Sequence, residues 1–248
     1  MAEELNISPM VTGILLERGL QDAASMRDFL YGSATPFHDP FLLKDMQRSV
    51  ERIERALAVG EQITVYGDYD VDGITSTCVL VRYLKSRGAA CRYYIPDRLT
   101  EGYGLNKPAL LKLRDSGVSM VITVDSGITA VEEIAYANEI GLKVVVTDHH
   151  ECKDDLPDAA AVVNPKRTDS TYPFKDLAGV GVVFKLVCAL EGSENLERVV
   201  TTYLDLVAVG TIADVMRLQG ENRVIVTYGL LLLQQTDNPG LRMLMREA

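Results

Sequence analysis

The stretch Ile63-Thr-Val-Tyr-Gly-Asp68-Tyr-Asp70-Val-Asp72-Gly73 decides both the fold and the chemistry expected of this chain. Its first five residues are typical of a short buried β-strand, and Asp68, Asp70 and Asp72 follow at alternate positions. Alternate residues of an extended segment point to the same side, so these three carboxylates are predicted to converge on one point. Carboxylates that lie so close repel one another unless some are protonated, and a bound divalent cation would remove the conflict.

The chain after this stretch repeats a pattern of apolar strand, polar or glycine turn, and helix. Short continuous apolar strands that alternate with helices indicate a mostly parallel sheet with helices on both faces. We therefore predict an α/β fold with about five strands. The expected strands are 63–67, 92–95, 120–124, 143–147 and 161–163, and the expected helices include 74–87, 107–116 and 130–140.

In parallel sheets a ligand lies beyond the carboxyl ends of the strands, so the residues that follow each strand are the first candidates for a site. Asp125 follows the third expected strand, and Asp148, His149 and His150 follow the fourth. A single Asp after a strand is more often a turn or helix-cap residue than a ligand. Three strand ends that agree, one of them with two of the three histidines, indicate a metal site.

A further acid follows from a segment between Tyr203 and Met216 that is apolar almost all round and is therefore predicted to be a buried helix. Burying an acid costs free energy unless it is paired or bound to a metal. We therefore take Asp214 as the final candidate ligand. A Gly179-Val-Gly181 run opens the preceding expected helix, where glycine permits close packing or the approach of a phosphate.

Composition limits the class of protein. The 248 residues are 47% hydrophobic and 24% charged, as in ordinary globular proteins, and the longest apolar runs are too short to cross a bilayer. The N-terminal Met-Ala-Glu-Glu is acidic where a secretory signal is positive. The four cysteines show no tight spacing and fit reduced thiols, so we expect a cytoplasmic protein with no membrane partner.

The net charge of -10 argues against a nucleic-acid partner, which usually leaves a basic footprint. The window 80–114 differs, because it holds eight Lys or Arg against two acids, together with four tyrosines. Basic residues interleaved with aromatics suit a single-stranded nucleic acid, although solvated helix faces have the same composition. Within this window Arg98 is a candidate to hold a phosphate and Tyr103 to stack a base, with a surface salt bridge and a loop tyrosine as the alternatives.

Residues 1–60 are predicted to form a helical N-terminal extension packed on the core, because apolar residues recur there at helical spacing. A break in this helical pattern is expected at 33–40. Residues 61–248 are predicted to form the catalytic domain.

Two known motifs compete for the acid cluster. The spacing of Asp68, Asp70 and Asp72 is that of an EF-hand loop, but the twelfth position is Val79 rather than Glu and a strand precedes the loop. An Asp-x-Asp pair after a strand also occurs in haloacid-dehalogenase-type phosphatases, where Asp70 would be the nucleophile and Asp72 the acid/base. That interpretation leaves the two adjacent histidines without a role, and it is kept as an alternative.

The Asp148-His149-His150 run, with Asp125 and the Asp cluster upstream of it, resembles the DHH phosphoesterase superfamily. Within that superfamily, five ordered motifs resemble the RecJ family of single-stranded-DNA-specific exonucleases. The motifs are Val65-Tyr-Gly-Asp-Tyr-Asp-Val-Asp-Gly-Ile-Thr-Ser76, Ile95-Pro-Asp-Arg-Leu-Thr-Glu-Gly-Tyr-Gly-Leu-Asn106, Val146-Thr-Asp-His-His-Glu151, Leu177-Ala-Gly-Val-Gly181 and Gly210-Thr-Ile-Ala-Asp-Val-Met216. The resemblance covers the N-terminal catalytic part of that family, whose C-terminal substrate-binding subdomain is absent from this chain.

The resemblance implies a phosphodiesterase with two Mn²⁺ ions, with Mg²⁺ as a possible substitute. The resemblance implies that Asp125 bridges the two ions. Asp70 would bind one ion, with Asp68 nearby as a ligand or as a holder of water, and Asp72, His149 and Asp214 would bind the other. Five carboxylates against two divalent cations leave about one negative charge, which is a tolerable balance. Oxygen ligands with an imidazole also suit manganese, with magnesium a weaker substitute.

The resemblance also implies catalytic roles for Asp125, His149, His150 and Asp148. His150 would position the scissile phosphate, and Asp148 would orient the histidines. In the wider superfamily a histidine ligand often stands where this chain has Tyr66, which favours Asp68 as its substitute.

The implied function is the removal of nucleotides from the end of single-stranded DNA, 5′ to 3′, in DNA repair and recombination. By the same resemblance a single-stranded-DNA-binding protein or a helicase is a possible partner, while the oligomeric state stays unknown. One alternative keeps the site but takes short RNA oligonucleotides or cyclic dinucleotides as substrates. Another is a non-catalytic DHH scaffold, which loss of ligands would signal, and none of the matched ligands is lost here.

Overall fold

The computed structural model describes residues 1–31 and 37–247, so residues 33–36 of the expected break lie outside the described part. Its elements in chain order are α1 (Ala2–Leu5), α2 (Pro9–Glu17), α3 (Ala23–Tyr31), η1 (Pro40–Leu42), α4 (Met46–Val59), β1 (Ile63–Tyr66), α5 (Val71–Ser86), β2 (Cys91–Tyr94), α6 (Lys107–Asp115), β3 (Met120–Val124), α7 (Val131–Glu139), β4 (Lys143–Thr147), β5 (Ala161–Val163), α8 (Gly179–Glu191), η2 (Ser193–Asn195), α9 (Leu196–Ala213), α10 (Gly220–Leu233) and α11 (Pro239–Glu247).

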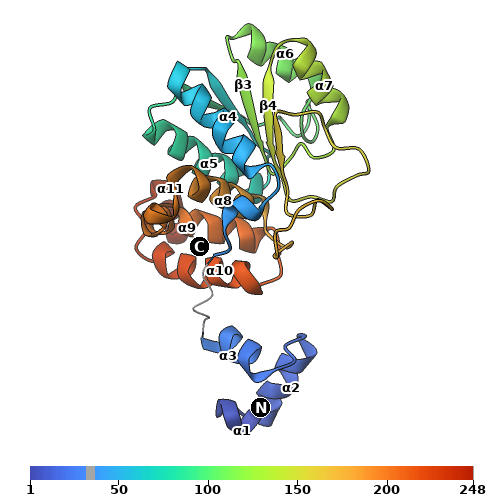
Figure 1. The fold of residues 1–248 in the computed structure, drawn as a ribbon. Helices are drawn as coiled ribbons and strands as arrows, with labels where there is room; N and C mark the ends of the chain where they lie inside the picture. The colour runs from blue at the N-terminus through green and yellow to red at the C-terminus, as the bar shows by residue number, and fades with distance from the viewer. Residues whose placement is uncertain (32–36, 248) are drawn as a thin grey trace.

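The five strands form one parallel sheet in the order β2-β1-β3-β4-β5, which confirms the predicted fold class. Strand β2 lies on one side of β1, whereas β3, β4 and β5 are added in turn on its other side. The order of the strands therefore changes direction between β1 and β3. This is the kind of switch point where ligands of open parallel sheets bind. All carboxyl ends lie at one edge, the lower one in Figure 1.

Helices cover both faces of the sheet because its strands are apolar on both sides. Ile63 and Val65 of β1 pack in the larger core with α4, α5 and α8, whereas Val144 and Val146 of β4 pack in a second core with α6 and α7. Helices α9 and α10 add a further layer, with α9 against α5 and α8. Among the described residues, no helix has the length and apolar character that a bilayer span needs.

The segment before β1 divides into two parts. Helix α4 belongs to the main body, since Met46 and Ile53 are fully buried in its larger core. Helices α1–α3 instead gather around their own small core of Leu5, Leu15 and Met26, and they lie apart from the sheet, beneath α10 (Figure 1). We call α1–α3 the N-terminal helical unit.

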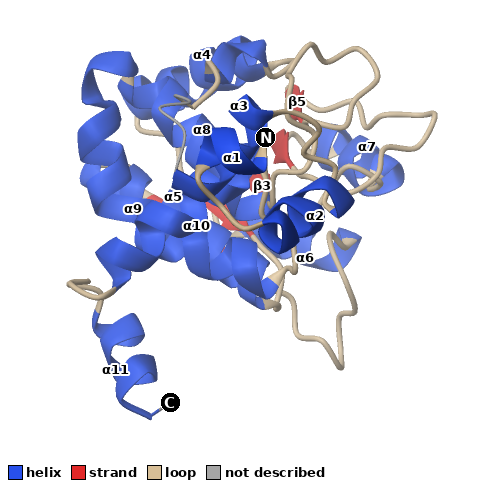
Figure 2. Cartoon of the chain, turned by 90° about the horizontal axis from the view of Figure 1, so that it is seen from below, coloured by secondary structure: helices blue, strands red, loops and turns tan. Residues whose placement is uncertain are grey.

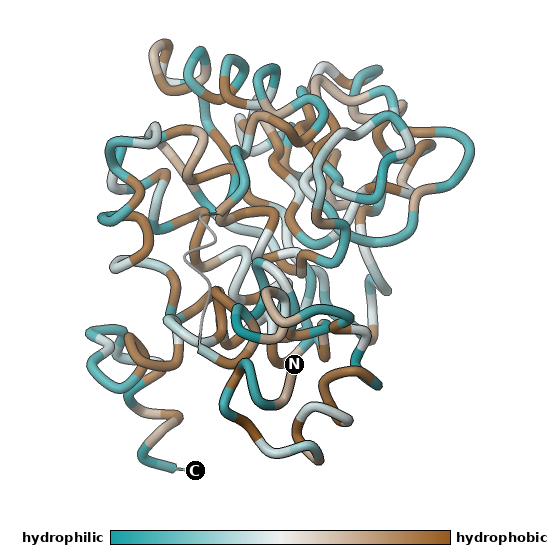
Figure 3. Tube along the Cα trace, turned by 60° about the horizontal axis from the view of Figure 1, so that its bottom comes forward, coloured by the Kyte–Doolittle hydropathy of each residue, from teal (hydrophilic) through white to brown (hydrophobic). Residues whose placement is uncertain are grey.

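Helix α11 also lies at the margin of the molecule. It projects from the main body (Figure 2), and the trace near the C-terminus passes repeatedly between hydrophobic and hydrophilic residues (Figure 3). Leu241 is its one buried residue within 239–247.

Candidate metal centre

The acids after β1 are arranged differently from the prediction that they converge on one point. Helix α5 begins at Val71, three residues earlier than expected, so Asp72 lies in its first turn. Asp70 caps this helix, and its Oδ1 accepts a hydrogen bond of 2.8 Å from the backbone of Gly73. Asp68 is buried and precedes the helix. The extended backbone assumed for the prediction therefore ends at Asp70. Asp68 and Asp70 lie in one group of candidate ligand atoms, and Asp72 lies in another.

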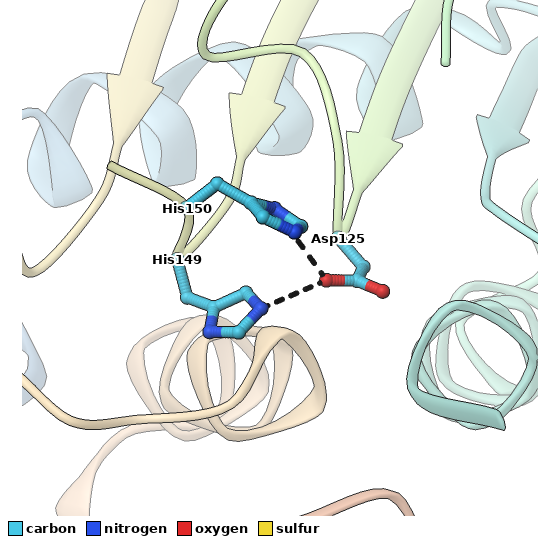
Figure 4. A group of neighbouring side chains, drawn as sticks. All are labelled: Asp125, His149 and His150. Carbon is cyan, nitrogen blue, oxygen red and sulfur yellow. Dashed lines mark ion pairs between the residues drawn. The ribbon is translucent and has the colours of Figure 1, made fainter. Parts of the chain in front are cut away.

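Asp125 occupies the centre of the site, directly after β3. It is buried and adopts a left-handed backbone with φ of 56°, which is uncommon for a residue other than glycine. Its Oδ1 lies 3.2 Å from Nε2 of His149 and 4.0 Å from Nδ1 of His150, both of which follow β4. Figure 4 shows the two imidazoles and the carboxylate directed toward one another.

Asp214 joins the site from the end of α9. Its Oδ2 lies 3.6 Å from Nε2 of His149, and Asp72 lies 3.8 Å from the same nitrogen. The expectation that Asp214 sits inside a buried helix was wrong, because α9 ends at Ala213 and the Asp214 side chain is 27% exposed. The next residue, Val215, has φ of 56°, a strained conformation for a β-branched side chain.

The start of α8 contributes backbone groups that the sequence did not reveal. The amides of Gly179 and Val180 donate to the two oxygens of Asp72 at 2.7 and 2.8 Å. A Cβ on Gly179 would lie 2.6 Å from Oδ1 of Asp125, so only glycine fits there. The Gly-x-Gly run at the start of a helix was the available signal, but its first glycine approaches a carboxylate of the chain itself.

Burial raises the pKa of the central acids in the metal-free chain. The pKa of Asp72 rises to about 8, through burial and then the charge of Asp125, and the pKa of Asp125 rises to about 9, through burial and then the charge of Asp70. Burial also raises the pKa values of Asp68 and Asp214. Burial and the charges of neighbouring acids both disfavour the ionised form, so some of these acids are expected to be protonated at neutral pH.

Asp148 is the exception, because hydrogen bonds hold its pKa below the usual value although burial acts to raise it. Its Oδ1 accepts from the backbone of His149 and of His150 and lies 2.8 Å from Nδ1 of the His150 ring, while its Oδ2 accepts from the backbone of Ile128. The same pair raises the pKa of His150 to about 9. Both oxygens of Asp148 therefore accept hydrogen bonds, and its role is to orient the two histidines.

The donor set fits one or more divalent cations. Three carboxylate oxygens of the site are buried without a hydrogen-bond partner, namely Asp68 Oδ2, Asp125 Oδ1 and Asp214 Oδ2. Ligand atoms lie within 4.8 Å of one another in three groups, which are Asp68 with Asp70 and Asp125, Asp72 with His149 and Asp214, and Asp125 with His149 and His150. Buried acceptors without donors are costly, and a cation would satisfy them.

The other predicted site residues lie at the rim. The Tyr103 hydroxyl is 3.4 Å from Nε2 of His150 and 3.5 Å from the backbone oxygen of Asp125, so Tyr103 reaches the site. Arg98 does not reach it directly, since its guanidinium lies 5.3 Å from the ring of Tyr69, which in turn packs edge-on to Tyr103. Tyr66 is buried with its hydroxyl donated to the backbone of Gly104, away from the acids.

Comparison with known proteins adds to this geometry. Residues 62–211 match the DHH family, N-terminal domain. The single-stranded-DNA-specific exonuclease RecJ of Bacillus subtilis is 47% identical over 246 residues, which are 99% of this chain and 31% of that protein.

Two crystal structures of RecJ from Thermus thermophilus are also similar. The complex with Mn²⁺ has a TM-score of 0.79 at 33% identity, and it covers 99% of this chain and 34% of that chain. The complex with Mg²⁺ has a TM-score of 0.68 at 30% identity, with coverage of 99% and 31%. The chain spans about a third of the length of these relatives.

Proposed function

The chain belongs to the DHH family, and on that premise we propose that it is a metal-dependent phosphodiesterase that removes nucleotides from the end of single-stranded DNA, 5′ to 3′. The observation that carries the proposal is the set of buried acids and an imidazole that converge with unsatisfied ligand atoms. The identity of 47% to an exonuclease named for this substrate supports single-stranded DNA. A role in DNA repair and recombination would follow from such an activity.

The cofactor that we propose is a pair of Mn²⁺ ions, with Mg²⁺ as a substitute. Asp68 and Asp70 would hold one ion. Asp72, His149 and Asp214 would hold the other, and Asp125 would serve both. This division follows two of the three groups of ligand atoms. The complexes of the T. thermophilus relative with Mn²⁺ and with Mg²⁺ support the choice of metals. Two bound divalent ions would supply an activated water and stabilise charge on the oxygens of an in-line displacement.

The residues of the chain would position the substrate. His150 is held through Nδ1 by Asp148 at 2.8 Å, so its Nε2 edge is fixed in direction and partly exposed beside Tyr103. A fixed nitrogen at the rim of the acids suits contact with a phosphate of the strand. Arg98 would contact the strand further out. No side chain needs to act as a covalent nucleophile.

The haloacid-dehalogenase alternative is not supported, because the chain matches the DHH family and Asp70 is engaged as the cap of α5. For the rest of the molecule, we propose that residues 61–248 form the catalytic domain and residues 1–60 a helical extension, of which α4 packs in the larger core. The four free cysteines support a cytoplasmic location. A single-stranded-DNA-binding protein or a helicase remains a proposed partner.

Release of labelled nucleotides from 5′-labelled single strands tests this function directly. We expect release that depends on Mn²⁺, that falls to background in Asp125→Ala, and that is much slower on duplex DNA. Faster turnover of short RNA oligonucleotides or cyclic dinucleotides than of single-stranded DNA would assign the other substrate class. Equal activity of Asp125→Ala would refute the metal mechanism, and no hydrolysis of any of these substrates would favour a scaffold.

A further inference from the structure

A groove of about 560 Å³ lies between the N-terminal helical unit and α10, and none of the acids of the metal centre lines it. Its walls include Leu20, Phe29 and Tyr31 on the side of α3 and Gln219, Arg223 and Tyr228 on the side of α10. Figure 1 shows α3 beneath α10, and two hydrogen bonds join the walls: Arg223 Nε donates to the backbone oxygen of Phe29, and Gln219 Nε2 to that of Arg18. The proposed catalysis uses none of these residues.

Two arginines lie at one aromatic ring of this groove: Arg223 lines it, and Arg18 lies beside it. The Arg223 guanidinium stacks on the Phe29 ring at 3.8 Å from its centre, and the Arg18 guanidinium lies 5.9 Å from the same centre. Neither arginine forms a salt bridge with any residue in the described ranges, although Asp28 also lines the groove. Two arginines on one ring, neither held in a salt bridge, favour an anionic ligand.

The groove also presents exposed aromatic rings. The side chain of Tyr31 is 65% exposed and that of Tyr228 is 49% exposed. Tyrosine rings and stacked guanidinium planes bind nucleic-acid bases through their flat faces, while arginines bind the phosphates between them. A small inorganic anion would not contact the aromatic rings, and an apolar peptide would not pair with the arginines. The combination favours a single-stranded nucleic acid.

The groove adjoins the metal centre through one short loop. Asp214 belongs to the acid cluster, and Gln219, five residues later, lines the groove. Five residues span at most about 18 Å even when fully extended, so the two regions are close neighbours. The loop between them is open to solvent, with Val215 87% exposed and Leu218 40% exposed. A strand with one end at the acids could follow this loop into the groove.

We propose that the groove between α3 and α10 binds single-stranded nucleic acid a few nucleotides away from the scissile bond. The inference rests on the proposed function for the identity of the strand, and it adds a second contact that favours long strands over short ones. Arg18 and Arg223 would contact phosphates, and Tyr228 would stack a base. The N-terminal helical unit thereby becomes part of the substrate-binding surface.

Binding without catalysis provides the first test. Anisotropy of a fluorescent 20-nucleotide strand, measured in EDTA, should show a Kd raised at least about fivefold by Tyr228→Ala, as expected for the loss of one stacked base. Arg18→Gln should lower the slope of log Kd against log salt by about 0.7, the value for one phosphate contact with a single strand. Arg27→Gln, an exposed arginine of α3 that is not at the Phe29 ring, is the matched control and should change neither quantity.

Strand length provides the second test. In the nucleotide-release assay, Arg18→Gln and Tyr228→Ala should raise KM at least about fivefold for a 20-nucleotide strand and leave a four-nucleotide strand unaffected. An equal rise in KM for both strand lengths, or no rise for either, would refute the proposed binding of the strand in this groove. A parent chain that releases nucleotides from no strand would instead refute the proposed function, and the binding measurements alone would then decide on the groove. Failure of the parent to bind the 20-nucleotide strand would also overturn it.

Discussion

Replacing Asp125 with asparagine should stabilise the metal-free chain and abolish its response to manganese. The Asp125 side chain is buried, and burial with the charge of Asp70 raises its pKa to about 9. An unfolded aspartate has a pKa of about 3.9 and is charged at pH 7.5, whereas the folded acid must take up a proton, which costs the folded state at most about 5 kcal/mol. Because Asp72 and Asp214 share this repulsion, we expect the single substitution to recover about 1–3 kcal/mol.

The backbone of Asp125 determines which substitution is informative. Its φ of 56° lies in the left-handed region, which asparagine adopts more readily than alanine. Asp125→Ala should therefore lose about 1–2 kcal/mol to backbone strain, which offsets the relief of charge. Asp125→Asn keeps the size of the side chain and removes only its charge. The matched control is Asp154→Asn in an exposed loop, which should leave the stability unchanged.

Thermal melts between pH 5 and 9, in EDTA and with Mn²⁺, measure both effects. For a chain of this size 1 kcal/mol shifts Tm by about 2–4 °C, so Asp125→Asn should melt about 2–12 °C above the metal-free parent at pH 7.5. A pKa raised in the folded state lowers stability as the pH rises from about 4 to about 9, so this difference should grow over that range. A variant that melts below the metal-free parent, or that Mn²⁺ stabilises as strongly as the parent, would refute the crowding argument.

Three further substitutions and one control test other parts of the site. His149→Ala should lower Mn²⁺-dependent nucleotide release by about 100-fold or more, because a buried ligand is lost. Circular dichroism should stay unchanged, because the substitution removes no backbone contact. Gly179→Ala places a methyl group 2.6 Å from Asp125 Oδ1 and should destabilise the chain by about 1–3 kcal/mol and weaken Mn²⁺ binding in calorimetry. Gly181→Ala, with its nearest contact at 3.2 Å to a leucine methyl, should have a smaller effect on both. Tyr103→Phe should lower kcat and leave KM unchanged, because the ring stays and only the hydroxyl beside His150 is removed. A raised KM with kcat unchanged would instead assign that hydroxyl to strand binding.

The sheet could be predicted from the sequence because its signal is local. The strands Met120–Val124, Lys143–Thr147 and Ala161–Val163 begin and end where predicted, since each is an apolar run bounded by polar or turn residues. Since parallel strands end at one edge, this also placed the candidate ligands Asp125 and His149 near each other. Their roles as ligands stay a prediction.

The arrangement around the acids was less predictable, because it depends on contacts between distant segments. Asp70 and Asp72 were expected to continue the strand, but a carboxylate that caps the helix allows α5 to begin at Val71. Nothing near Gly179 in the sequence shows that its backbone meets Asp72, more than a hundred residues earlier. The separate core of the N-terminal helical unit was likewise hidden, because helical periodicity does not say which surface a helix will cover.

The distribution of hydrogen-bond donors, more than the number of acids, shows where a cation is needed. Asp72 is as deeply buried as Asp125, yet both of its oxygens accept backbone amides from the start of α8, which offset part of the rise in its pKa that burial causes. Asp125 Oδ1 has no such donor, and neither has Asp214 Oδ2. A cation therefore changes the stability of the chain mainly through the acids that lack donors. On this reasoning Asp72→Asn should stabilise the metal-free chain less than Asp125→Asn does, because an amide group placed there would turn a donor toward one of the α8 amides and so offset the relief of charge.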